Sequence, residues 1–242
     1  MLAVLAGCAF RVTSPSEVDA PRGLGTSDGD AAQTGGAIAM DSQSSASTSN
    51  SLTLTWSHTV GPGLTRSLVI VGLSIEKTSG ASVESITYAG MSLTKAGAAS
   101  GTSGVKAELW YLTAPAAGAN NLVVTFTKPL STDGAVGGAI SLSGVDQTTP
   151  VSTTATNGGD GTPSTTITTV NDGAWIIDTI MVDNGDAVTP ADAGRQGRWS
   201  TAQGNLIRGA GSTVATTMHG ATTTSWTSTS DKWAQVVAEL KP

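Results

Sequence analysis

Oxygen-bearing side chains are grouped at two places where a hard cation could bind. Asp183, Asn184 and Asp186 lie within four residues of one another, and Asp160 closes an Asn-Gly-Gly-Asp run. Calcium takes six to eight oxygen ligands, which closely spaced Asp, Asn and backbone carbonyl groups can supply, although this spacing is not that of an EF-hand loop. Asn, Asp and Gly also form ordinary turns. Two interpretations therefore stay open, a calcium site at Asp183, Asn184, Asp186 and Asp160, or turns without a metal.

Six tryptophans stand out among few aromatic residues. An exposed indole can stack against a sugar ring, because one of its faces is broad and apolar. Trp199 lies in the polar run RQGRWST, close to Arg195, Arg198 and Gln203. The pattern predicts a glycan-binding platform made of Trp199, Arg195, Arg198 and Gln203. Four others lie in alternating or apolar runs and are expected in the core, namely Trp56, Trp110, Trp175 and Trp233.

Sequence motifs of catalysis are missing from the chain. The hydrolase motif G-x-S-x-G, the Walker sequence, H-E-x-x-H and paired C-x-x-C do not occur. A zinc site would need both histidines, His58 and His219, together with carboxylates, so we expect hydrogen-bonded or surface roles for them. Asp178 stands inside the apolar run WIIDTIMV, where a carboxylate is costly unless it is paired. We expect it to face a polar edge or to be hydrogen-bonded locally rather than to act as a general acid, and we expect no enzymatic activity.

The chain begins MLAVLAGCAF, with small residues before its one cysteine, Cys8. Small side chains at these positions let a signal peptidase approach the backbone. Leu5-Ala6-Gly7-Cys8 resembles the lipobox of bacterial lipoproteins, in which the cysteine thiol carries a diacylglycerol and the chain is cut before it. The resemblance implies a signal-like segment over 1–8, lipidation of Cys8, export, and anchoring at the bacterial cell surface or outer membrane. A single cysteine also excludes a disulfide within the chain.

Residues 9–50 contain mostly Ser, Thr, Gly, Ala, Asp and Pro. So few large apolar groups cannot offset the entropy lost on ordering, and the composition predicts a flexible linker with a reach of roughly 35 Å. The apolar island Gly36–Met40 allows an alternative, in which this part lies along the edge of a sheet.

The overall composition excludes several classes of protein. Among 242 residues only 12% are charged, which argues against coiled coils and helical bundles. A net charge of −6 argues against nucleic-acid partners. Because no apolar run reaches the length of a spanning helix, we expect membrane contact through lipid at Cys8.

From Leu52 onward, alternating and short apolar runs are punctuated by Gly, Pro, Asn and Asp, which is typical of strands joined by tight turns. Strands without covering helices must pack sheet against sheet. The pattern predicts an all-β protein, a jelly-roll-like antiparallel β-sandwich over residues 51–242. The predicted strands are 52–56, 67–75, 85–88, 91–94, 106–112, 121–127, 135–143, 164–170, 174–182, 197–201, 209–214, 222–227 and 232–240.

The sandwich region is similar to itself over about 52–145 and about 165–242. SLVIVGLSI in the first part matches AWIIDTIMV in the second, and Phe126 falls opposite Trp226 when the ends are compared. We interpret the two parts as pseudo-repeated halves of one sandwich. The alternative is that any two Thr-rich β-sequences match this well.

The runs ELWYL, NNLVVTFT, AISLSGVDQTTP and KWAQVVAEL are similar to poorly annotated β-sandwich modules of secreted bacterial surface proteins and phage structural proteins. The resemblance implies a display or adhesion module. We therefore expect a non-enzymatic exported surface lipoprotein whose head serves adhesion, surface structure or protein contact, with a glycan or a surface protein as partner. Two alternatives are a carbohydrate-binding module and a filament or virion subunit whose arm, Ala37–Ser51, adds a strand to its neighbour.

Overall fold

The computed structural model describes residues 36–76, 78–228 and 231–242. Within these ranges the chain forms strands joined by turns, and the one helical element is a 3₁₀ turn at Thr102–Gly104. None of the described residues belongs to a helix long and apolar enough to cross a membrane. The predicted signal-like segment 1–8, with Cys8, lies outside the described residues, as do residues 9–35 of the predicted linker. Residues 36–242 belong to one compact unit, which is the subject of all that follows.

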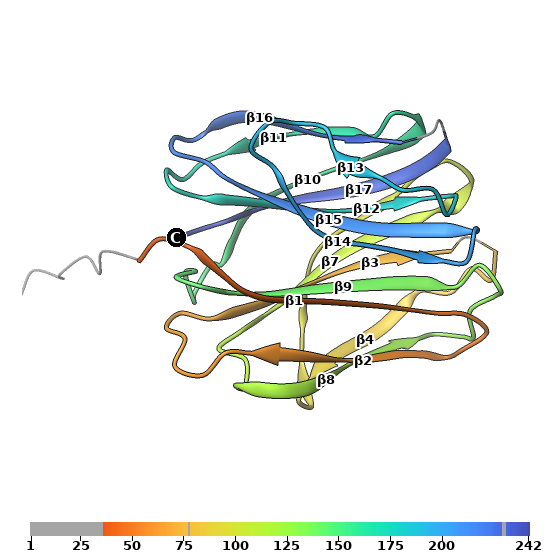
Figure 1. Ribbon diagram of the computed structural model, residues 1–242, viewed down its shortest axis with the longest axis horizontal. Helices are drawn as coiled ribbons and strands as arrows, with labels where there is room; N and C mark the ends of the chain where they lie inside the picture. Colours follow the sequence, from red (N-terminus) through yellow and green to blue (C-terminus); the bar gives the residue numbers. More distant parts are fainter. Residues whose placement is uncertain (1–35, 77, 229–230) are drawn as a thin grey trace, which may run out of the picture. The chain divides into compact units, whose positions relative to one another are not determined.

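The first half of this unit forms a complete jelly roll (Figure 1). Its inner sheet has the order β1-β9-β3-β7-β6, and its outer sheet has the order β2-β8-β4-β5, with antiparallel neighbours throughout. Strands that alternate between two sheets in this way make two Greek keys. The strands are β1 (Ala39–Thr48), β2 (Thr53–Val60), β3 (Leu68–Ile75), β4 (Val83–Tyr88), β5 (Met91–Ser92), β6 (Thr94–Ser100), β7 (Lys106–Thr113), β8 (Gly118–Phe126) and β9 (Ala135–Ser143).

The second half repeats this topology. Its inner sheet has the order β10-β17-β12-β15-β14, and its outer sheet has the order β11-β16-β13. The strands are β10 (Val151–Gly161), β11 (Ser164–Thr169), β12 (Trp175–Val182), β13 (Thr189–Pro190), β14 (Gln196–Gln203), β15 (Ile207–Ala215), β16 (Gly220–Thr227) and β17 (Asp231–Leu240).

Register and bulges show that the two halves are equivalent strand by strand. A bulge interrupts β1 between Met40 and Ser42, and a bulge interrupts β10 at the same place. The bulge between Lys95 and Gly97 in β6 likewise matches the one between Gly197 and Trp199 in β14. A bulge shifts the side chains of its strand. Bulges at the same positions in both halves are therefore stronger evidence of a structural repeat than strand order alone. The predicted pseudo-repeat is therefore confirmed, but each half closes its own sandwich instead of forming half of a shared one.

The two inner sheets pack face to face through glycine and tryptophan. In the second half Trp199 projects from β14 onto the paired glycines Gly72 and Gly138, where an added Cβ would come within 2.6 Å and 2.2 Å of its ring. At the equivalent place in the other half the sizes are reversed, with Gly97 opposite Val236. Glycine thus lets the two sheets approach closely around one large ring. Ile70, Ile140, Ile177 and Met181 contribute to the same cluster.

The predicted strands are all present, and the all-β jelly-roll class is confirmed. The interpretation of 9–50 as a flexible linker is wrong over Ala39–Thr48, because these residues form β1 along the edge of β9. Ser, Ala and Thr suit an edge strand, since its backbone bonds come from the neighbouring strand and only half its side chains are covered. The alternative position of the 36–40 island at a sheet edge is confirmed, with Ile38 buried.

Candidate functional site

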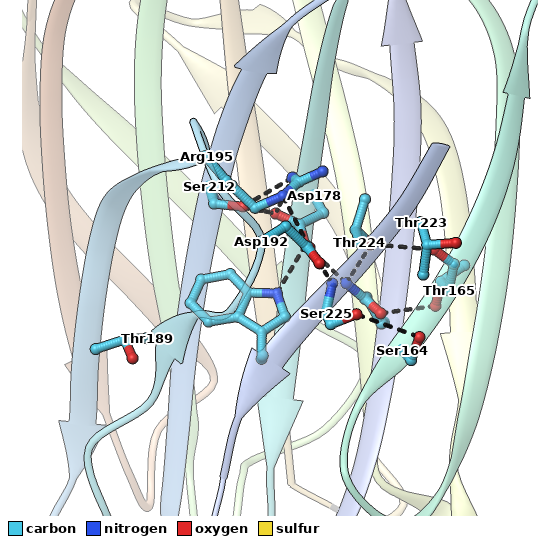
Figure 2. Close-up of polar contacts among 12 residues, drawn as sticks. Ser164, Thr165, Asp178, Thr189, Asp192, Arg195, Ser212, Thr223, Thr224 and Ser225 are labelled. Carbon is cyan, nitrogen blue, oxygen red and sulfur yellow. Dashed lines mark hydrogen bonds and ion pairs between the residues drawn. The ribbon is translucent and has the colours of Figure 1, made fainter. Parts of the chain in front are cut away.

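A buried polar cluster lies between the sheets of the second jelly roll (Figure 2). Asp178 on β12 is fully buried, and its Oδ1 accepts hydrogen bonds from the backbone N–H of Ser212 at 3.0 Å and from the Ser212 hydroxyl. Its Oδ2 accepts from Trp226 Nε1 and from Gln235 Nε2, each at 2.7 Å. Asp178 is hydrogen-bonded, but the expected polar edge or local partners are wrong, because it lies in the interior and its partners are distant in the sequence. Four donors hold the carboxylate in place, which suits a structural role.

Arg195 enters this cluster from the loop between β13 and β14. Its Nη1 lies 3.6 Å from Asp178 Oδ1 and donates to Ser212 Oγ at 3.0 Å, and its Nε lies 3.6 Å from Asp192 Oδ2. The Arg195 side chain is 1% exposed. The Arg195 guanidinium therefore balances the charge of the buried Asp178 carboxylate. Because its side chain is buried, Arg195 is not accessible to a ligand on the surface.

The network continues from Asp178 toward the outer sheet. Gln235 Nε2 also donates to Thr224 Oγ1 at 2.8 Å, and Gln235 Oε1 accepts from Thr165 Oγ1 at 2.6 Å. At the equivalent position of the first jelly roll, Val71 stands on β3 where Asp178 stands on β12, and it packs in an apolar cluster. At this position the second jelly roll therefore has a hydrogen-bonded carboxylate where the first has an apolar side chain.

The predicted glycan platform is wrong. Trp199 is 7% exposed because its ring is enclosed between the two inner sheets, and Arg195 is buried in the Asp178 cluster. Arg198 donates to Thr213 Oγ1 at 2.7 Å and lies over the Trp175 ring at 5.8 Å, and burial lowers the pKa of its guanidinium. Gln203 donates to Ser49 Oγ at 3.2 Å. The prediction failed because polar neighbours in the sequence do not show whether a strand face is covered, and the face of β14 that carries Trp199 is covered by the inner sheet of the first jelly roll. Trp56, Trp110 and Trp233 are buried and Trp175 is half-buried, in agreement with the expected core positions.

The residues of the predicted calcium site are separated by a strand. Asp160 belongs to β10 instead of a loop and is paired in register with Lys232, while the backbone N–H of Asp183 donates to the Lys232 carbonyl at 2.9 Å. A lysine of β17 thus stands between the two acids. Asn184 Oδ1 accepts from the Asp186 backbone N–H at 3.0 Å, as in a turn. Among the described residues, no group of three or more His, Cys, Asp or Glu side chains could hold a metal ion.

The two histidines lie in different jelly rolls. His58 on β2 is buried, its Nδ1 lies 2.8 Å from Ser44 Oγ, and its Nε2 has no hydrogen-bond partner in the described structure. Burial lowers the pKa of His58 to about 4, although Asp41 opposes the shift. His219 is exposed and pairs with Asp172 at 2.8 Å, and its hydrogen bonds lower the pKa of that carboxyl. Both histidines are hydrogen-bonded, as expected.

Two further buried carboxylates, Glu76 and Glu239, hold backbone turns, and no sequence pattern predicted either role. Burial alone would raise the pKa of Glu76, but hydrogen bonds from Ser131, Ser79 and Thr78 outweigh it and lower that pKa. Glu239 accepts from the backbone N–H groups of Val170 and Asn171, at 3.0 Å and 2.8 Å. Carboxylates used in this way fix loops to the sheets.

The outer-sheet strands show a contrasting surface, on which Glu84 of β4 is the one charged side chain among the described residues of these strands. Threonine and serine side chains form rows along β11 and β16, which Thr189 of β13 extends. Their hydroxyl groups are paired at Thr166–Thr223, 2.9 Å apart, and at Thr189–Thr227, 2.7 Å apart. The corresponding strand of the first jelly roll, β2, exposes a similar row of Thr53, Thr55, Ser57 and Thr59. Such faces offer methyl groups and hydroxyl donors and acceptors instead of ionised groups.

Comparisons with protein-family models, with curated proteins and with solved structures found no match for this chain.

Proposed function

We propose that the chain is a non-enzymatic exported bacterial lipoprotein whose tandem jelly-roll head acts by contact, in adhesion, surface structure or protein binding. One contrast supports the proposal. Four buried ionisable side chains, Asp178, Arg195, Glu76 and Glu239, make structural hydrogen bonds, whereas strands of the outer sheets expose rows of uncharged hydroxyl groups. Reactive chemistry requires ionisable groups directed toward a substrate, and contact requires accessible surface.

Lipid attachment at Cys8 is tested by metabolic labelling with a fatty-acid analogue. The full chain and its Cys8→Ser variant are expressed in a bacterial host. We expect label on the wild-type chain in the membrane fraction and an unlabelled, soluble variant. Equal labelling of the two chains, or of neither, contradicts the anchor.

Contact through the outer faces is tested with the full chain displayed on cells. Thr223→Lys introduces a charge into the hydroxyl row of the second jelly roll, and Thr55→Lys introduces one into that of the first. We expect adhesion to host cells or to a glycan array to fall in at least one variant. Adhesion that is unchanged in both, and in the double variant, contradicts a contact role for these faces.

A carbohydrate ligand is the second candidate. The outer face of the first jelly roll combines the β2 hydroxyl groups with Asn121, which is opposite Ser57 in register. Hydroxyl and amide groups can hydrogen-bond a sugar without an indole platform. A glycan-array signal that Thr55→Lys removes would favour this candidate over a protein partner.

A strand-exchanging subunit is the third candidate. The segment expected to pair with a neighbour forms β1 and is paired with β9 of the same chain over Ala39–Thr48. Assembly by this route therefore requires β1 to leave its own sheet, and a chain that stays monomeric at high concentration argues against it.

A further inference from the structure

The second jelly roll lacks a hairpin that the first one has. In the first, β4 and β5 are joined at Ala89-Gly90, and β4 pairs with β8 from Phe126 to Leu122. In the second, β13 contains only Thr189–Pro190 and pairs with β16 at Thr227 and Trp226 alone. The chain then leaves the outer sheet through residues 191–195 and enters β14 (Figure 1).

The backbone directions of β8 and β16 show what this loss uncovers. The N–H of Phe126 donates toward β2 and the N–H of Trp226 toward β11, so these two residues are equivalent. Because backbone groups alternate in direction along an antiparallel strand, Val123 must face β4, and Thr223 must face the opposite edge from β11. Val123 is paired with Thr87 of β4. Thr223 has no strand beside it on that edge in the described part of the chain.

The loop that replaces the hairpin covers only the beginning of this edge. The N–H of Ala191 donates to the Ser225 carbonyl at 2.9 Å, and the Ser225 N–H donates to Asp192 Oδ2 at 2.6 Å. Farther along β16, the outward backbone groups of Thr223 and Ala221 find no such partner among the described residues. The outer sheet therefore ends in a short open edge at Ala221–Thr223.

A pocket adjoins the open edge. In the first jelly roll the hairpin buries Tyr88 completely, and its hydroxyl donates to the Gly118 carbonyl at 2.9 Å beside the fully buried Leu122. The equivalents of Gly118 and Leu122 are Met218 and Thr222. They line an open pocket of about 420 Å³ formed by residues 214–222, with Met218 75% exposed. The space filled by a tyrosine in one half is thus open in the other.

We propose that the β16 edge at Ala221–Thr223 binds an extended segment of a partner protein by strand addition. The added strand continues the ladder that β13 begins, with its backbone bonded to Thr223 and Ala221 and one large apolar or aromatic side chain in the 214–222 pocket. In strand addition, main-chain hydrogen bonds supply affinity and side-chain pockets supply specificity. The neighbouring rows of threonine carry no charge, so binding depends on backbone hydrogen bonds and on the one apolar or aromatic side chain, and not on ion pairs. This inference rests on the proposed contact function and names its site and class of partner.

The chain itself provides the probe. A labelled peptide with the sequence of residues 83–93, VESITYAGMSL, reproduces the hairpin that covers the equivalent edge in the first jelly roll. Fluorescence anisotropy with the full chain should show saturable binding. Thr223→Pro removes the outward N–H and should weaken binding about fivefold, the effect of losing one hydrogen bond.

Thr166→Pro is the matched control. Thr166 is directly opposite Thr223 in register, and its N–H faces the other edge of the same sheet. The two variants therefore replace the same type of residue in the same outer sheet and differ in the edge whose N–H is removed. We expect Thr166→Pro to bind the peptide as the wild type does. A second variant, Thr222→Trp, fills the pocket without touching the open backbone groups and should also weaken binding; it keeps the test decisive if Thr223→Pro does not fold.

Three results would overturn the proposal. The first is no peptide binding at millimolar concentration, and the second is binding that Thr166→Pro weakens while Thr223→Pro does not. The third is self-association of the full chain that Thr223→Pro abolishes, which assigns the edge to a second copy. None of these affects lipid labelling of Cys8, so failure of this site is distinguishable from failure of the exported head.

Discussion

At the scale of residues, the second jelly roll differs from the first chiefly in its buried polar groups. Asp178 occupies the place of Val71, and Arg195 enters from the shortened loop to meet it. A buried ion pair is costly unless further hydrogen bonds satisfy its groups, and Ser212, Trp226 and Gln235 satisfy the Asp178 carboxylate. Arg195 Nε has no hydrogen-bond partner in the described structure. The carboxylate of Asp178 within an apolar run could be noticed in the sequence. Its partners could not be predicted, because they come from three other strands and a loop that are distant in the sequence.

His58 gives a prediction at this scale. Its folded-state pKa of about 4 lies below the ordinary 6.5, so acid protonates the unfolded chain first. The contribution of His58 to the free energy of unfolding is therefore fully present above pH 6.5. It is lost as the pH decreases from 6.5 to 4, which lowers the free energy of unfolding by about 3 kcal/mol. Urea unfolding of the wild type at pH 7.5 and pH 4 measures the loss.

His58→Gln should lose about 3 kcal/mol less than the wild type over the same interval. His219→Gln, at the exposed histidine, is the control and should behave as the wild type. An equal acid sensitivity of wild type and His58→Gln would show that His58 is not the responsible group.

At the scale of elements, alternation and turn residues were enough to find strands such as Leu68–Ile75 and Trp175–Val182, which are apolar and buried. They were not enough for β1 and β10. β1 is rich in Ser, and β10 is rich in Thr and Gly. Both strands lie at sheet edges and owe their order to the backbones of β9 and β17. Edge strands of this composition have no pattern that separates them from loops.

The contact between the inner sheets gives a prediction at this scale. Gly138→Val should destabilise the protein by about 3 kcal/mol, because its side chain would overlap the Trp199 ring. In a Trp199→Gly background the same substitution should cost much less, since the pair then matches Gly97 and Val236 in the other half. A double-mutant cycle by urea unfolding measures the coupling, expected at about 1–3 kcal/mol.

Gly159→Val is the control for that cycle. An added Cβ at Gly159 comes no closer than 3.9 Å to Trp233, so a small effect of about 0.5 kcal/mol is expected. Additive effects of the Gly138 and Trp199 substitutions would contradict the close fit between the inner sheets.

At the scale of the whole molecule, the chain is a fused pair of jelly rolls joined through their inner sheets, which leaves two outer sheets to meet other surfaces. Duplication was visible in the sequence through SLVIVGLSI and AWIIDTIMV. The difference between the halves that matters for binding was not visible in the sequence. It is the absence of a hairpin equivalent to β4–β5, and it is found only when equivalent strands are compared. Covering one outer edge and leaving the other open makes the second jelly roll the half that receives a partner.

Hydrogen exchange at two equivalent amides tests this account most directly. Val123 on β8 is paired with β4, whereas Thr223 on β16 faces the open edge. In the free full chain, native-state exchange followed by NMR should show the Val123 amide strongly protected and the Thr223 amide exchanging near the rate of an unstructured peptide. Protection of Thr223 equal to that of Val123 would contradict the open edge and the strand-addition site with it.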